Sequence, residues 1–467
     1  MEADVVVAGG GNAALCAAIS ARRAGASVVL LERADIRLRG GNTRHTRDIR
    51  FAHDAPAGAA AAGTYAVDEF YADLLRVTGG ETNEPLASLT LRESMSLPQW
   101  MAEQGVRWQP PLSGTLHLSR TNGFFLGGGK HMVNTYFDTA QRLGAVVRYD
   151  STVTALITGG ARAHGVVIRG ERGAEERITA KAVVVAAGGF EADVAWLKEY
   201  WGEAAGNFVI RGTPHNTGLA LKAMYAAGAR RVGDPRGFHS TAVDARAPKF
   251  DGGIVTRIDS IPFGVALNVA GRRFYDEGED LWPKRYAIWG KLIAEQPQQT
   301  AFAFFDAKVA GRFIPSAFPA LTAASTGELA AKMGLDARAA TATIDGFNAA
   351  VRPGGTFAPS VLDDCRTDGL EPPKSHWAQR LDTPPFFGYV LRPGITFTYL
   401  GAAVDADARV LREDGDPFEN LYAAGECMAG NILSRGYLAG FGLTIGSVFG
   451  RIAGTRAAEH ARHRLAR

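Results

Sequence analysis

The sequence predicts an α/β protein in which a parallel sheet covered by helices is interrupted by a second domain of mixed α and β structure. Three observations predict this class: a strand–helix–strand pattern at the start of the chain, the return of a similar pattern near Leu421, and a change of composition between residues 235 and 373. The 467 residues are also too many for one ordinary core, so two or more packed units are expected.

The opening pattern begins with residues 4–8, a β-branched run typical of a buried parallel strand, and continues with residues 13–24, which have helical composition. Gly25 ends this helix, and a second apolar run at 27–31 ends at Glu32. A strand, a helix and a strand in this order form a βαβ unit, which is the start of a Rossmann-like domain.

Glycines join the first strand to the helix in a GxGxxA fingerprint, Gly9-Gly10-Gly11-Asn12-Ala13-Ala14. Glycine at positions 9 and 11 lets the backbone turn tightly and approach a pyrophosphate, and Ala14 lets the helix pack close to the strand. The helix N-terminus presents free N–H groups and the positive end of its dipole to phosphates, and Glu32 can bind ribose hydroxyls. The order of these parts predicts nucleotide binding, with a purely structural glycine turn as the alternative.

The following residues continue the alternation of helices and strands. Residues 65–104 have apolar residues at three- and four-residue spacing, which predicts helix. Residues 146–168 indicate strands with polar turns, 182–187 a buried strand, and 217–228 a helix that a glycine ends. Gly127-Gly128-Gly129-Lys130 is expected to open a helix, because it lacks the other residues that a phosphate loop needs.

The inserted domain is predicted from a denser use of aromatic residues and proline and from the loss of βαβ alternation. Pro353-Gly354-Gly355 and Glu371-Pro372-Pro373 are its expected exit loops. We therefore expect a discontinuous dinucleotide-binding domain formed by residues 1–235 and 374–467, with residues 236–373 inserted as an α+β domain.

Glycine-rich segments outside the first unit decide between FAD and NAD. Residues 421–426 form a strand that ends in Gly425-Glu426, residues 440–446 open the last helix, and residues 40–43 follow the second strand. A helix start at 440–446 can direct N–H groups at the C2 carbonyl of a reduced flavin. An NAD-only fold has no need for these segments, so the sequence predicts FAD.

The composition narrows the class of protein further. A formal net charge of +3 implies neither nucleic acid nor a membrane surface as a partner. Cys16, Cys365 and Cys427 are scattered, so we expect no disulfide framework, no iron–sulfur cluster on this chain and no metal site. The start of the chain lacks a secretory signal and no apolar run reaches membrane-spanning length, so a cytoplasmic protein is expected.

With these motifs the chain resembles the flavoprotein family of fumarate reductases and succinate dehydrogenases over nearly its full length, and within it most resembles FAD-dependent tricarballylate dehydrogenases. The resemblance rests on three long strings: Gly40-Gly41-Asn42-Thr43-Arg44-His45-Thr46-Arg47, Gly271-Arg272-Arg273-Phe274-Tyr275-Asp276-Glu277 and Trp282-Pro283-Lys284-Arg285-Tyr286-Ala287-Ile288-Trp289. It implies that FAD accepts a hydride at N5 while the substrate gains a carbon–carbon double bond, so that tricarballylate becomes cis-aconitate. It also implies that the inserted domain caps the flavin domain.

The resemblance implies that His239, Thr256, Arg257 and Arg435 bind substrate. His239 and Arg435 match residues that hold substrate carboxylates in fumarate reductases, and Arg257 stands where those enzymes have glutamate. Carboxylates in a water-poor pocket need charge-assisted hydrogen bonds, and the arginine fork matches their geometry. The change to Arg257 therefore suits a third carboxylate.

Arg285 is the predicted catalytic residue, because it matches the arginine that moves the proton in fumarate reductases, and it is also expected to bind substrate. Arginine scarcely deprotonates in proteins, which makes it an awkward base for an oxidation. Tyr437 is therefore a second predicted catalytic residue, with Tyr286 in reserve. Tyrosine performs this step in the related ketosteroid dehydrogenases.

Two departures from the family pattern refine these expectations. Phe397 replaces a second substrate-binding histidine of fumarate reductases, which argues against fumarate as the substrate. Asn42 stands where succinate dehydrogenases have the histidine that attaches FAD covalently, so non-covalent FAD is expected. His45 is close in sequence but out of register.

The motifs and the resemblance together define the predicted FAD site. It comprises Gly9, Gly11, Asn12, Ala13, Ala14, Glu32, Arg33, Gly41, Asn42, Thr43, Arg44, Val153, Ala187, Gly188, Gly425, Glu426, Gly442, Leu443 and Thr444. The electrons are expected to pass to a partner with iron–sulfur centres or haem, which would place the protein peripherally at the inner membrane. A ketosteroid-type dehydrogenase and the flavin subunit of a cobalamin-biosynthesis protein are the alternatives.

Overall fold

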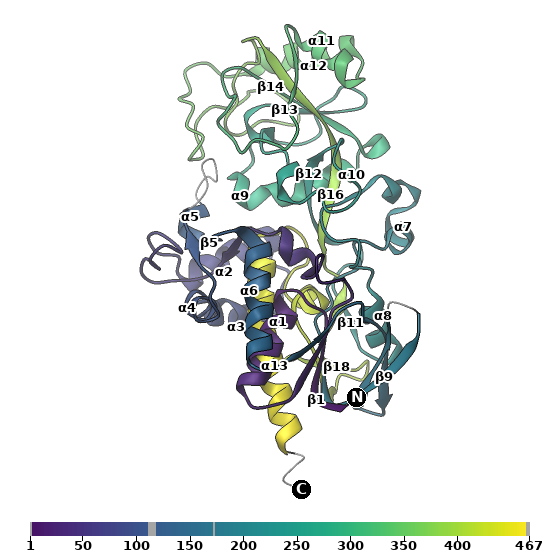
Figure 1. Ribbon diagram of the computed structural model, residues 1–467. Helices are drawn as coiled ribbons and strands as arrows, with labels where there is room; N and C mark the ends of the chain where they lie inside the picture. Colours follow the sequence, from purple (N-terminus) through teal and green to yellow (C-terminus); the bar gives the residue numbers. More distant parts are fainter. Residues whose placement is uncertain (1, 111–117, 171–172, 464–467) are drawn as a thin grey trace.

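The computed structural model describes residues 2–110, 118–170 and 173–463. These residues form two lobes, one above the other, with β1 and the end of α13 at the base of the lower lobe (Figure 1). The lower lobe contains the parallel sheet, and the upper lobe contains a second sheet with its own helices. The α/β fold class predicted from the sequence is confirmed.

An eight-stranded sheet forms the lower lobe, in the order β18-β19-β9-β1-β2-β6, with β7 and β8 attached through β9. The run from β19 to β6 is parallel, and β7, β8 and β18 are antiparallel to their neighbours. Leu421 of β19 pairs with Val183 of β9, so the predicted return of the dinucleotide pattern is confirmed. The strands are β1 (Glu2–Ala8), β2 (Val28–Leu31), β6 (Val146–Arg148), β7 (Thr152–Gly159), β8 (Arg162–Arg169), β9 (Glu175–Val185), β18 (Arg409–Leu411) and β19 (Pro417–Ala423).

Helices and a small sheet of order β3-β5-β4 complete the lower lobe, where α1 packs against both α6 and α13 (Figure 1). The region 65–104 is helical as predicted, but it is divided into three helices. The first break occurs because Gly79 adopts a left-handed conformation and Asn83 caps the next helix. The elements are α1 (Asn12–Arg23), β3 (Asp48–Arg50), α2 (Val67–Thr78), α3 (Glu84–Ser94), α4 (Leu97–Glu103), β4 (Trp108–Gln109), α5 (Leu118–Thr121), β5 (Asn122–Phe125), α6 (Gly128–Arg142) and α13 (Phe441–His463).

A six-stranded sheet spans the upper lobe in the order β10-β16-β14-β13, with β12 and β15 also paired to β16. The long strand β16 runs from the upper lobe down to the lower one (Figure 1). The boundaries at residues 235 and 373 stay predictions. The remaining elements are α7 (Val194–Trp201), β10 (Val209–Ile210), α8 (Leu219–Ala226), β11 (Arg231–Val232), β12 (Phe238–Asp244), β13 (Val265–Asn268), α9 (Trp282–Arg285), α10 (Trp289–Ala294), β14 (Ala301–Asp306), β15 (Leu321–Ala323), α11 (Thr326–Met333), α12 (Ala337–Ala350), β16 (Phe386–Thr398) and β17 (Gly401–Ala402).

Three glycines at four-residue spacing, Gly446, Gly450 and Gly454, form a stripe along α13 that faces α1. A Cβ on Gly450 would lie 2.4 Å from the Ala13 carbonyl oxygen, and one on Gly454 would lie 2.1 Å from the Ala17 carbonyl oxygen. The two helices therefore meet backbone to backbone, which brings the start of α13 beside the start of α1.

Replacing Gly454 by alanine is expected to destabilise the protein by about 1–3 kcal/mol, the usual cost of overpacking, although alanine favours a helix. The matched control is G346A in α12, where an added Cβ meets nothing within 4 Å, and this change is expected to stabilise. The expected gain there is about 0.5–1 kcal/mol. Urea unfolding followed by circular dichroism measures both changes. A G454A protein as stable as the wild type would contradict the close packing.

Candidate functional site

A cavity opens at the carboxyl ends of β1, β2, β9 and β19 and continues toward the upper lobe. The structure brings most of the predicted FAD residues to its walls: Gly9, Gly11, Asn12, Ala13, Glu32, Arg33, Gly41, Asn42, Thr43, Val153, Ala187, Gly188, Gly425, Glu426, Gly442 and Leu443. The predicted substrate and catalytic residues His239, Arg257 and Tyr437 also line it. The two kinds of predicted residue therefore share one cavity.

The turn after β1 leaves no room for a side chain. Gly9 has a φ of 117°, and a Cβ there would lie 2.2 Å from the Ala186 carbonyl oxygen. The buried Glu32 carboxylate accepts the backbone N–H groups of Ala34 at 2.9 Å and Gly40 at 3.1 Å, and burial raises its pKa. The exposed backbone of this turn can contact a pyrophosphate, and the carboxylate can bind ribose hydroxyls. Together they fit a dinucleotide.

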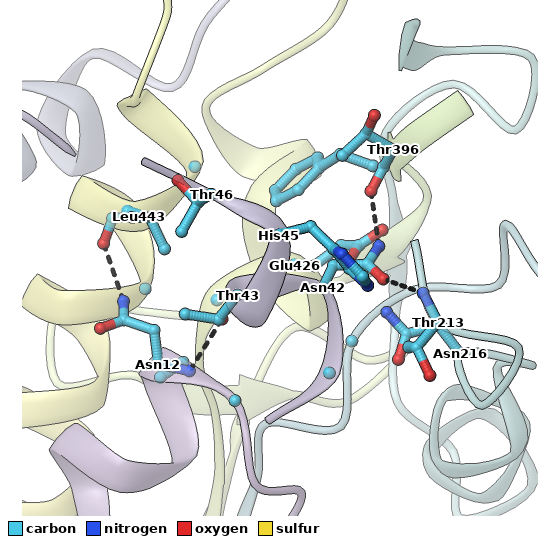
Figure 2. Close-up of a pocket in the computed structure, with 18 of the residues that line it drawn as sticks. Asn12, Asn42, Thr43, His45, Thr46, Thr213, Asn216, Thr396, Glu426 and Leu443 are labelled. Carbon is cyan, nitrogen blue, oxygen red and sulfur yellow. Dashed lines mark hydrogen bonds between the residues drawn. The ribbon is translucent and has the colours of Figure 1, made fainter. Parts of the chain in front are cut away.

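Asn12, the first residue of α1, joins three segments of the chain (Figure 2). Its backbone N–H donates to Thr43 Oγ1 at 3.0 Å, and its Nδ2 donates to the Leu443 carbonyl oxygen and to Ser447 Oγ, both at 3.0 Å. Thr43 lies in the 3-10 helix η1 (Gly41–His45). The N-termini of α1 and α13 therefore both reach the cavity, where first-turn N–H groups lack helical acceptors and suit the anionic and electron-rich parts of FAD.

Two buried carboxyl groups beside the cavity, Glu191 and Glu426, lie close enough together that each influences the protonation of the other. Glu191 Oε1 also accepts Asn42 Nδ2 at 2.5 Å and Asn216 Nδ2 at 2.7 Å, and Glu426 Oε1 accepts the Thr398 N–H at 2.7 Å. Burial raises the pKa of both carboxyls, and Glu191 raises the pKa of Glu426 further. Two neighbouring buried carboxylates oppose each other's ionisation, so we expect the pair to share one proton.

Three arginines and two aspartates line the part of the cavity below the upper lobe: Arg47, Arg211, Arg257, Asp48 and Asp259. Arg257 Nε and Nη2 donate to the two oxygens of Asp259 at 2.5 and 2.6 Å, and Arg47 Nε lies 3.5 Å from Asp48 Oδ2. Arg211 forms no ion pair with any residue that the structure describes. These five side chains therefore carry one positive charge in excess.

His239 stacks on the ring of Tyr437 with centroids 4.0 Å apart, and its Nδ1 is buried without a hydrogen-bond partner in the described part of the chain. Burial, with the charges of Arg211 and Arg257, lowers the pKa of His239 well below its usual value, so the imidazole is neutral. The Tyr437 hydroxyl accepts the Gly442 N–H at 2.7 Å. This wall of the cavity thus combines aromatic faces with uncharged polar groups.

Tyr286 lies edge-on to His239, with centroids 5.5 Å apart, and also lines the cavity. The guanidinium of Arg257 lies 4.6 Å from the centre of its ring. Burial raises the pKa of Tyr286, whereas Arg257, Arg211 and Arg47 act in the opposite direction. The phenol therefore faces the cation-rich part of the cavity.

Some predicted site residues lie outside the cavity lining: Ala14, Arg44, Thr256, Arg285, Arg435 and Thr444. Arg285 donates to both carboxylate oxygens of Glu279, at 2.5 and 2.8 Å. Arg435 pairs with Glu81, and its side chain is 58% exposed. Thr256 Oγ1 donates to the Gly253 carbonyl oxygen at 3.1 Å. Arg285 and Arg435 would have to exchange these partners to meet a substrate, so their roles stay predictions.

Arg47, Arg211 and Glu191 line or adjoin the cavity, yet the sequence patterns gave them no role. Glu191 follows a Gly-Gly-Phe run soon after the buried strand β9, and Arg211 interrupts an apolar run after β10. A charged residue inside such an apolar context is the signal that would have found both, because a buried charge needs a partner.

Over the ranges that the structure describes, no group of three or more His, Cys, Asp or Glu side chains is placed to hold a metal ion. Likewise, no described helix combines the length and the apolar composition needed to cross a membrane. Cys16, Cys365 and Cys427 are each buried with a free thiol.

Replacing Glu426 by glutamine is expected to flatten the pH dependence of stability. The amide keeps an oxygen for Thr398 and supplies an N–H for Glu191 without a titrating proton. In the wild type both folded-state pKa values are raised, so the folded protein holds more protons than the unfolded chain above the usual glutamate pKa of about 4.5 and loses stability as the pH rises from there.

The free energy of unfolding of E426Q, relative to the wild type, should therefore increase between about pH 5 and pH 8. Urea titrations at the two pH values measure this difference. The reverse trend, or a difference that does not change with pH, would contradict a shared proton. E419Q, at an exposed glutamate of β19, is the control and should leave the pH dependence unchanged.

Comparison with known proteins identifies the family of the chain. The family model described as "FAD binding domain" matches residues 4–442. The chain is 28% identical over 487 residues to the NADH:fumarate oxidoreductase of Klebsiella pneumoniae (strain 342), a match that covers 98% of this chain and 48% of that relative. The chain thus spans about half the length of this relative.

Two solved structures share the fold. A flavocytochrome c3 fumarate reductase in an open conformation aligns with a TM-score of 0.75 at 22% identity, covering 98% of this chain and 78% of that one. The 3-ketosteroid-Δ4-(5α)-dehydrogenase from Rhodococcus jostii RHA1 aligns with a TM-score of 0.74 at 24% identity, covering 98% and 97%. The prediction of FAD as the cofactor is confirmed by the family match, and the chain belongs to the FAD-binding-domain family of flavoproteins.

Proposed function

We propose that this protein is an FAD-dependent dehydrogenase that removes two hydrogens from adjacent carbons of a polycarboxylate, with tricarballylate as the substrate and cis-aconitate as the product. The observation that supports this most strongly is the excess positive charge of Arg47, Arg211 and Arg257 over Asp48 and Asp259, in a cavity continuous with the dinucleotide cradle. A buried excess of positive charge favours an anionic ligand. It opposes a substrate that consists only of apolar rings.

FAD, when bound, supplies the hydride acceptor of this reaction. The chain's own residues bind the acid, keep water out and take up the proton. Asp259 orients Arg257 through Nε and Nη2, and the Nη1 group, which bonds no residue that the structure describes, can meet a substrate carboxylate. Neutral His239 adds a hydrogen bond without adding charge. Each group is held in place before substrate arrives, which lowers the entropy cost of alignment.

We assign the uptake of the proton to Tyr286. Arg285, the residue that the sequence predicted for this step, is held by Glu279 outside the cavity lining. The hydroxyl of Tyr437 is engaged by the Gly442 N–H, and burial raises the pKa of Tyr437 far above its usual value. Burial raises the pKa of Tyr286 as well, but the arginines around it act in the opposite direction, so its position supports the role better.

We further propose that the electrons leave the flavin for a separate redox partner that carries iron–sulfur centres or haem. The name of one similar structure, a flavocytochrome c3 fumarate reductase, supports a haem-carrying partner. A flavin reduced by one acid must be reoxidised before the next, so an electron acceptor is required for turnover.

A ketosteroid-type dehydrogenase is the second candidate, because one observation favours it. The Tyr437 hydroxyl lines the cavity and accepts the Gly442 N–H at 2.7 Å, which leaves its own O–H to donate to a ketone oxygen. The rings of Phe397 and His239 beside them offer apolar faces to a flat substrate. The shared fold with a 3-ketosteroid dehydrogenase is consistent with this alternative.

Flavin-loaded protein is expected to reduce an artificial dye with tricarballylate at a kcat/KM at least about tenfold above that with succinate, because the third carboxylate adds a charge-assisted hydrogen bond. Parallel assays with tricarballylate, succinate and 4-androstene-3,17-dione measure this directly. Turnover of the steroid alone would support the second candidate. Turnover of none of them would favour a flavin subunit that serves an assembly.

Replacing Tyr286 by phenylalanine is expected to lower kcat for the oxidation by about 100-fold or more, the usual contribution of a general base, and to change KM little because the ring remains. Rapid-mixing measurements of flavin bleaching report the step. The paired variant is R285Q, which should lower kcat by less than about tenfold if Arg285 stays on Glu279. A large loss in R285Q together with a small loss in Y286F would return the role to Arg285.

A further inference from the structure

Arg211 follows the short strand β10 and lies in the cavity wall, and its side chain connects segments that are far apart in sequence. It is 6% exposed. Its Nε donates to the Gly253 carbonyl oxygen at 3.0 Å, and its Nη1 donates to Thr396 Oγ1 at 2.8 Å and to Thr241 Oγ1 at 3.3 Å. The guanidinium is therefore fixed in one orientation by partners that carry no charge.

The two other arginines of this part of the cavity differ from Arg211 in their charge balance. Both carboxylate oxygens of Asp259 accept hydrogen bonds from Arg257, and Asp48 lies beside Arg47. Each of these pairs offers N–H groups but little net charge. Arg211 forms no ion pair among the described residues, and burial together with Arg257 lowers its pKa to about 10, so it remains charged at neutral pH.

A buried cation without a counterion is costly unless a ligand supplies the opposite charge. The Nη2 group of Arg211 makes no hydrogen bond to any residue that the structure describes, and the side chain lines the cavity. That group is thus the part of the guanidinium left for a ligand. A carboxylate oxygen is the acceptor that matches it in charge and geometry.

We propose that Arg211 is the residue that selects an acid with three carboxylates over one with two. Resting on the proposed function, this inference names the group that meets the additional carboxylate. The N–H groups that Asp259 and Asp48 leave over on Arg257 and Arg47 can hold two carboxylates by hydrogen bonds, while a third carboxylate needs net positive charge to offset its lost hydration. This moves to Arg211 the role that the sequence suggested for Arg257, whose fork is already filled by Asp259.

The test is a titration of the flavin-loaded protein with tricarballylate and with succinate, followed by the change in flavin absorbance, for the wild type and R211Q. We expect R211Q to weaken tricarballylate binding by about tenfold or more and succinate binding by less than about threefold, because one charge-assisted hydrogen bond is lost only with the tricarboxylate. R338Q, at an exposed arginine of α12, is the charge-matched control and should change neither.

Equal losses for both acids, or no loss, would overturn the proposal. If R211Q does not retain FAD, R211K and T396V serve as milder variants, and each should weaken tricarballylate more than succinate. Measuring binding and turnover separately distinguishes the selection by Arg211 from the proposed oxidation. A wild type that binds tricarballylate in an Arg211-dependent manner but does not oxidise it refutes the proposed reaction and leaves the selection by Arg211 standing. A wild type that binds neither acid overturns both.

Discussion

The structure depends on three chain segments that meet at the start of α1 with almost no side-chain atoms between them. A Cβ on Gly425 would lie 2.8 Å from Ala13 Cβ, and one on Gly446 would lie 3.0 Å from Asn12 Nδ2. Only backbone and small residues can approach so closely, and this closeness places the N-termini of α1 and α13 together at the cavity. The packing of the core and the cradle of the dinucleotide thus rest on the same contact.

Much of the fold and of the cofactor site could be predicted because the signals are local. Strand period, a glycine turn and a helix start all act within a few tens of residues, so Gly9 and Glu32 were recognised from the βαβ unit. No role could be predicted for Arg211 and Glu191, because their surroundings are formed by residues that are far away in the sequence. Arg211 meets Thr396 across 185 residues of sequence, and only the folded chain reveals that no carboxylate of the described residues pairs with it.

Distant contacts also determine which partners surround Arg285 and Arg435, whose roles stay predictions. A motif identifies Arg285 and Arg435, but it does not show which carboxylate of the chain already occupies each guanidinium. Lys284, beside Arg285 in α9, donates to Asp73 of α2 at 2.7 Å, and Arg76 pairs with Asp280 at 2.6 Å. These contacts tie the two lobes together on one side.

The strand β16 ties the lobes on the other side in a different manner. Its first half is hydrogen-bonded to β14, and its last residues are paired with β12 at the edge of the cavity. There the Thr396 carbonyl oxygen accepts Asn42 Nδ2, and the Thr398 N–H donates to Glu426. A strand hydrogen-bonded along both edges does not stretch, so a tilt of the upper sheet must displace these two backbone groups. The upper sheet and the cavity-lining Asn42 and Glu426 are therefore mechanically linked through one covalent segment.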